Sequence, residues 1–124
     1  MQFSSLIFIS TLLVSQKVEA GFSNSGIMKS KSINLSVGCN LENDGGLFGA
    51  ESVNLCCDTF SGKGLVKSPQ IVIKTNNFNF TGEINCSGKC MIIATTYFDD
   101  QMFKRSGDGE FVIVFHENLF EEIN

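Results

Sequence analysis

Apolar side chains recur at every second position in several short segments of this chain, and no helical period is sustained. Residues 32–39 alternate between polar and apolar side chains, which places the apolar ones on one face of an extended strand. Comparable strand patterns lie at 53–57, 71–74, 78–82 and 111–115, and the β-branched and aromatic run 91–98 suits a central strand. The pattern therefore predicts an all-β protein.

Turn-forming residues separate these segments. Glycine, asparagine, aspartate, serine and proline are frequent at 40–49, 61–64, 68–69 and 99–110. The whole chain has 124 residues, a length typical of a single domain. Six or seven short strands over about 100 residues favour a small antiparallel β-sandwich, which we expect to span residues 32–116. A flexible arm at 21–31 and an acidic tail at 117–124 are expected to flank it.

The first twenty residues have the features of a secretory signal peptide. The apolar run 6–14 is too short to cross a bilayer core of about 30 Å. Val18 and Ala20 are small or modest residues at the positions that a signal peptidase recognises, which predicts cleavage before Gly21. No later apolar stretch is long enough to span a membrane. We therefore expect a secreted, extracellular protein.

Five cysteines follow the predicted cleavage site, and an oxidising compartment favours their pairing. Five is an odd number, so two disulfides and one remaining thiol are expected. Cys39 and Cys57 share the inward face of their strands, and a bridge between them is open on this ground alone. Adjacent Cys56 and Cys57 point to opposite faces, which disfavours a four-thiolate zinc site with Cys86 and Cys90.

Three N-glycosylation sequons begin at Asn34, Asn79 and Asn85. Asn79 lies between Phe78 and Phe80, so a strand that buries both rings must turn the asparagine outward. Asn34 has the same relation to its apolar neighbours. We expect all three sites to carry glycans.

The order of these features is similar to that of small secreted transthyretin-like and pollen Ole e 1-like domains. A strand ends at Val37-Gly38-Cys39, and residues 49–57 read Gly-Ala-Glu-Ser-Val-Asn-Leu-Cys-Cys after a turn-rich loop. The apolar strand with Phe78 and Phe80 and then Cys90-Met91-Ile92 complete a resemblance that covers about residues 33–97. The turn Thr-Asp-x-x-Gly of those families is present only as residues 74–77 without the glycine, and Cys56 is an additional cysteine.

The resemblance implies a disulfide-stapled β-sandwich that acts as a secreted, non-enzymatic module. Such modules bind small hydrophobic molecules, carbohydrates or proteins. The resemblance also favours a bridge between Cys39 and Cys90, which leaves Cys86 to pair with Cys57 or, alternatively, with Cys56.

Composition and motifs exclude some functions. The chain has 9 basic and 13 acidic residues, with the basic ones scattered, so a nucleic-acid surface is not indicated. His116 is the only histidine and lies on the outward side of the last strand. Acidic pairs such as Asp99-Asp100, and Asp108 with Glu110, lack the spacing of a calcium loop. We expect no catalytic residue, metal or cofactor.

The leading interpretation is a secreted, non-enzymatic binding module that recognises an extracellular protein or a small ligand through loops or a sheet face. One alternative is a small secreted hydrolase or redox protein that uses His116 and a free cysteine. A second alternative is a membrane-perturbing effector that uses phenylalanines in loop or tail segments, namely Phe48, Phe60, Phe103 and Phe120.

Overall fold

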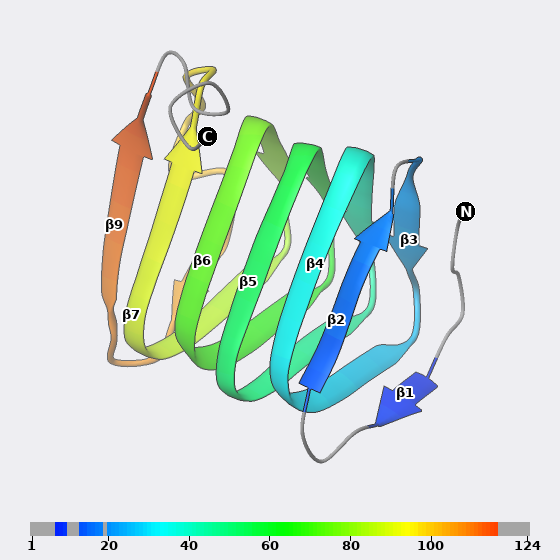
Figure 1. The fold of residues 1–124 in the computed structure, drawn as a ribbon. Helices are drawn as coiled ribbons and strands as arrows, with labels where there is room; N and C mark the ends of the chain where they lie inside the picture. Colours follow the sequence, from blue (N-terminus) through cyan, green and yellow to red (C-terminus); the bar gives the residue numbers. More distant parts are fainter. Residues whose placement is uncertain (1–6, 10–12, 19, 117–124) are drawn as a thin grey trace.

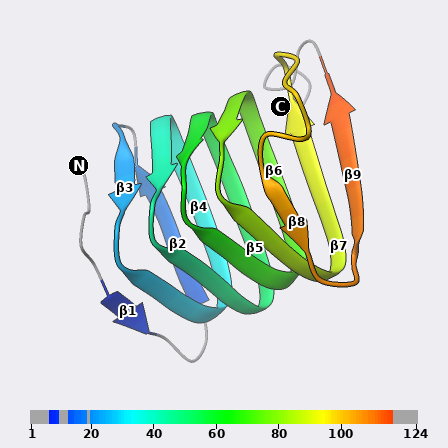
Figure 2. The same cartoon turned by 180° about the vertical axis from the view of Figure 1, so that it is seen from behind.

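The computed structural model describes residues 7–9, 13–18 and 20–116. These residues form a parallel β-solenoid of about five turns (Figure 1). The expected all-β class is confirmed, whereas the antiparallel sandwich is wrong, because every strand pair in the sheet is parallel. Figure 2 shows from behind that the successive turns lie side by side.

Four long strands make the body of the solenoid, and short strands lie at its two ends. The long strands are β4 (Ile27–Asn43), β5 (Gly46–Gly62), β6 (Leu65–Phe80) and β7 (Glu83–Ala94). Three short strands pair with β4, namely β1 (Ile7–Ile9), β2 (Leu13–Val18) and β3 (Phe22–Asn24). Two more pair with β7 at the other end, namely β8 (Lys104–Ser106) and β9 (Glu110–Phe115).

The segment 21–31, expected to be a flexible arm, contains β3 and the start of β4. Residues 7–9 and 13–18 of the expected signal peptide lie alongside β4 as β1 and β2. The expected acidic tail at 117–124 lies outside the described residues.

Strand partners lie about nineteen positions apart in sequence, and like side chains therefore stack on like. Leu35 aligns with Leu55, and the same row continues through Ile73, Ile92 and Ile113. The first four of these side chains are fully buried. Each turn thus continues one apolar core, and burial of this stacked surface is the main stabilising contribution.

Glycines at one corner let successive turns approach closely. A Cβ atom at Gly64 would lie 2.1 Å from the carbonyl oxygen of Gly45, and one at Gly82 would lie 2.0 Å from that of Gly64. The backbone carbonyl of Gly45 accepts a hydrogen bond from the Leu65 N–H, and that of Gly64 accepts one from the Glu83 N–H. The corner therefore has no space for any larger residue.

Stacked aromatic rings fill part of the core next to this corner. The Phe60 and Phe78 rings have centroids 5.7 Å apart, and the Phe78 ring stacks on Phe98 at 4.4 Å. Phe80 stacks on Phe60 at 4.7 Å. The large aromatic content of the chain is thus partly explained by one continuous column of rings.

None of the five cysteines forms a disulfide, so the predicted bridges are wrong. Cys39 lies in β4 and Cys90 in β7, three strands further along the sheet. At about 4.8 Å per strand this separation is roughly 14 Å, well beyond the reach of a disulfide. Cys86 is two strands from Cys56 and Cys57, which excludes that pairing for the same reason. The alternative bridge between neighbouring strands, Cys39 with Cys57, is not formed either. The two residues do not share an inward face as expected, because Cys57 is buried and Cys39 is exposed.

Candidate functional site

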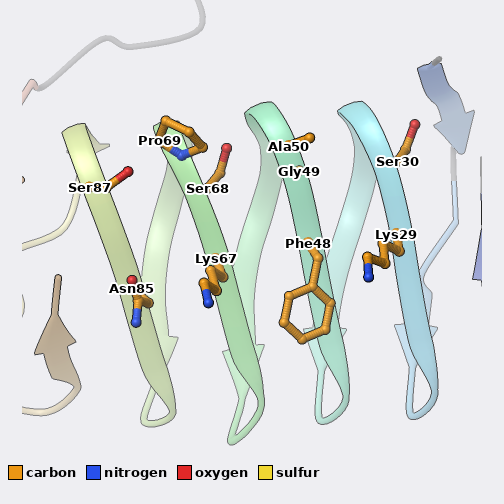
Figure 3. Close-up of a pocket in the computed structure, with 10 residues that line it drawn as sticks. All are labelled: Lys29, Ser30, Phe48, Gly49, Ala50, Lys67, Ser68, Pro69, Asn85 and Ser87. Atoms are coloured by element: carbon orange, nitrogen blue, oxygen red, sulfur yellow. The ribbon is translucent and has the colours of Figure 1, made fainter. Parts of the chain in front are cut away.

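A groove of about 470 Å³ crosses four successive strands, β4 to β7, on the outside of the solenoid (Figure 3). We call it the Phe48 groove. Its lining residues come from one side of each turn and from the corner that follows: Lys29, Ser30, Phe48, Gly49, Ala50, Lys67, Ser68, Pro69, Asn85 and Ser87.

One register row forms the floor of the Phe48 groove. Lys29 aligns with Phe48, Phe48 with Lys67, and Lys67 with Asn85. The residues that precede them in each strand are buried in the core, and strand alternation therefore turns this row outward. Figure 3 shows the four side chains side by side on neighbouring strands. Two lysines thus flank an aromatic ring across three consecutive turns.

The Phe48 ring lies over the backbone of Gly46. A Cβ atom added to Gly46 would be 2.4 Å from Cε2 of the ring and 2.9 Å from Cζ. A shallow apolar groove of about 450 Å³, lined by Ile27, Leu65 and other residues, shares Phe48 with the first groove. The half-buried ring is therefore an apolar platform between two hollows of the same face.

Ser30 lies in the wall of the Phe48 groove with an unsatisfied hydroxyl. The residue is only 3% exposed, and its Oγ has no hydrogen-bond partner among the described residues. Ser68, two turns along the same wall, is equally buried, and its Oγ accepts a hydrogen bond from the Gln70 N–H at 3.4 Å. A buried hydroxyl without a partner costs about 1–3 kcal/mol.

The electrostatics of the Phe48 groove differ from those of the whole chain. The net charge of the protein is −4, yet the lining includes two lysines and no carboxylate. Neither Lys29 nor Lys67 forms an ion pair with a described residue. The nearest ion pair along the chain joins Lys31 and Glu51 at 3.5 Å, and both belong to the corner beyond the groove. The groove is thus a locally cationic site on an anionic protein.

The three sequon asparagines lie in different environments. Asn79 is exposed on β6, and Asn34 is half-buried on β4, where its Oδ1 accepts a hydrogen bond from Asn54 Nδ2 at 2.8 Å. Asn85 lines the Phe48 groove. A glycan on Asn85 would therefore extend over the end of this groove.

The residues of the alternative enzymatic interpretation are far apart. His116 follows β9, and its backbone N–H donates to the Ala94 carbonyl. Cys90 aligns with Phe111 at the start of β9, and Cys57 lies on β5. Burial raises the pKa of both the Cys57 and the Cys90 thiol to about 12. Their reactive thiolate form is therefore disfavoured at neutral pH.

Other predicted candidates are also dispersed. Among residues 7–9, 13–18 and 20–116, no cluster of three or more histidine, cysteine, aspartate or glutamate side chains is placed to hold a metal. Asp100 instead pairs with Arg105 at 2.8 Å. Phe60 and Phe103 are buried in the core, and Phe120 lies outside the described residues. No helix in the described part of the chain is long and apolar enough to cross a membrane.

No family model, curated protein or solved structure matches this chain.

The Phe48 groove was not predicted from the sequence. The sequence pattern assigned Lys29 to an arm, Phe48 to a loop and Lys67 to a segment between two turns. The available signal was their spacing, because 48 − 29 = 19 and 67 − 48 = 19. A repeat of this length is typical of solenoids, in which equivalent positions of successive turns meet on one face.

Proposed function

We propose that this chain is a secreted, non-enzymatic binding module that holds an extended acidic polysaccharide in the Phe48 groove. The observation that carries the proposal is the outward row in which Lys29 and Lys67 flank the Phe48 ring on three consecutive strands. We propose the extracellular location because residues 1–20 have the features of a signal peptide.

The chemistry of the row matches a sugar chain that bears carboxylates. The two lysines are separated by two strand spacings, or about 9.6 Å, and offer cations to two separate anionic groups. The Phe48 ring offers an apolar surface to the C–H face of a sugar ring. Grooves that combine one apolar platform with a few placed polar groups are typical ligand sites.

A short oligogalacturonide is a direct probe of this function, and its methyl-esterified form is a matched neutral control. We expect calorimetry to detect binding of the acidic oligomer by unglycosylated protein, with affinity that falls as ionic strength rises. The double variant Lys29→Gln with Lys67→Gln should bind about tenfold or more weakly, because charge-assisted hydrogen bonds contribute roughly 1.5–3 kcal/mol each. Phe48→Ala should also weaken binding.

Lys63→Gln is the control variant, since Lys63 is exposed and does not line the groove. It should leave the affinity unchanged. Equal binding of the acidic and esterified oligomers, or equal loss in the control variant, would contradict a cationic carbohydrate site.

A further inference from the structure

The last turn of the solenoid leaves an open strand edge. Strand β9 pairs with β7 on one side, and no described strand pairs with its other side. Figure 1 shows β9 as the outermost strand at this end. We call this side the β9 edge. Exposed edges present unpaired N–H and C=O groups to other chains.

Side chains of β9 that face the core are incompletely covered. Phe111 and Ile113 are half-buried, and Phe115 is 44% exposed, whereas their row neighbours Cys90, Ile92 and Ala94 on β7 are fully buried. The rows of stacked core side chains therefore end in a partly exposed apolar surface on β9. A further strand paired with β9 would cover this surface.

The sequence of the β9 edge reads nearly the same in both directions. Residues 110–116 are Glu-Phe-Val-Ile-Val-Phe-His, which is symmetric about Ile113 except for its two ends. When two copies run antiparallel about Ile113, each phenylalanine faces a phenylalanine and each valine faces a valine. Glu110 then lies opposite His116 of the second copy. Such cross-strand aromatic and acid–base pairs stabilise a sheet.

The backbone directions agree with this register. The His116 N–H donates to Ala94 of β7, so even-numbered residues of β9 direct their backbone groups toward β7. The backbone groups of Phe111, Ile113 and Phe115 therefore point to the open side. In an antiparallel pair, residues that exchange both hydrogen bonds lie directly opposite and occur at every second position. Pairing about Ile113 makes these three residues the hydrogen-bonded ones.

We propose that two copies of this chain associate through their β9 edges, antiparallel about Ile113, to form a two-fold symmetric dimer. The partner strand covers the half-buried row on each copy, and the sheet becomes continuous through both molecules. A closed two-fold contact uses the same patch on both subunits and does not propagate into a filament. This inference is independent of the Phe48 groove.

Charge substitutions at the ends of the register test the dimer. Sedimentation equilibrium of the full chain should show a dimer, and Glu110→Lys should weaken it at least tenfold because both carboxylates that face His116 across the two-fold axis are lost. The double variant Glu110→Lys with His116→Glu should restore the dimer. Asp108→Lys, the same charge change outside the register, should have no effect, and circular dichroism should show that every variant is folded.

Mixing the single variants sharpens the test. Chains with Glu110→Lys and chains with His116→Glu should each dimerise poorly alone, yet should form a one-to-one heterodimer when mixed. A chain that stays monomeric at all concentrations, as expected if its own residues 117–124 cover the edge, overturns the proposal. A dimer that responds equally to the Asp108 and Glu110 substitutions overturns it as well.

Discussion

At the residue scale, alternate side chains of β4 and β6 face the core. The alternation of β4 is interrupted where its register shifts between Val37 and Asn40, and Cys39, which the sequence places inward, is exposed there. Phe78 and Phe80 are buried, and Asn79 between them is exposed, as the sequence predicts. The assignment succeeds because a one-residue shift would expose two rings, at a cost of roughly 2 kcal/mol or more for each.

Substitutions at Phe80 and Asn79 test which of the two side chains belongs to the core. Phe80→Ala should lower the free energy of unfolding by about 3–5 kcal/mol, since it removes a fully buried ring that stacks on Phe60. Asn79→Gln should leave that free energy nearly unchanged and, in secreted material, remove the mass of one glycan. Urea unfolding and mass spectrometry measure the two effects. A silent Phe80→Ala together with an unfolded Asn79→Gln protein would contradict the strand register.

Alternation could not show which cysteines lie close enough to form a disulfide. It places Cys57 correctly toward the core, but it contains no information about which turn a residue occupies. Cys90 is also buried in the core, two strands away from Cys57 along the sheet. Shared burial is therefore insufficient to predict a bridge, because a disulfide also needs the two Cα atoms within about 7 Å.

At the scale of secondary-structure elements, the turns expected from the sequence are only partly correct. The chain turns at 44–45 and 63–64, whereas Ser68-Pro69 lies inside β6 and most of 40–49 belongs to β4 and β5. Gly45, Gly64 and Gly82 are spaced by 19 and 18 positions and lie above one another at one corner. A turn signal indicates where a strand ends and does not indicate whether the chain reverses or continues round a solenoid. Strand direction was consequently wrong.

The glycine corner gives a quantitative prediction. Gly64→Ala should lower the free energy of unfolding by roughly 2 kcal/mol or more, because its Cβ would meet the Gly45 carbonyl oxygen and force two turns apart. Gly21→Ala is the matched control, since its Cβ would lie 3.5 Å from the nearest atom, the Asn40 carbonyl oxygen. Thermal unfolding of both variants measures the difference. Equal effects would indicate that the corner tolerates a side chain.

At the scale of the whole molecule, a solenoid is stabilised by contacts between neighbouring turns. Strands β1 and β2 belong to the predicted signal peptide and pair only with β4. Cleavage before Gly21 would make β4 an edge strand along most of its length, while β5, β6 and β7 would keep both of their neighbours. The fold can therefore persist without residues 1–20.

We expect the secreted protein to begin Gly21-Phe22-Ser23-Asn24 and to retain the circular dichroism spectrum of a β-protein. Its Tm should be several degrees below that of the full chain, since about 1 kcal/mol shifts Tm by roughly 4–8 °C in a domain of this size. N-terminal sequencing and thermal melts of both forms measure these outcomes. Secreted protein that retains Met1 would contradict the signal peptide.

The sequence by itself determined the β class, the inward face of segments such as 32–37 and 78–82, and the turns at 44–45 and 63–64. These features are local, because alternation and turn chemistry act over a few neighbouring residues. Only the tertiary structure decided that the strands are parallel, that the cysteines stay apart and that Lys29, Phe48 and Lys67 share one groove. An alternating strand looks the same in parallel and antiparallel sheets, and residues nineteen positions apart meet only when each turn of the chain closes on the one before it.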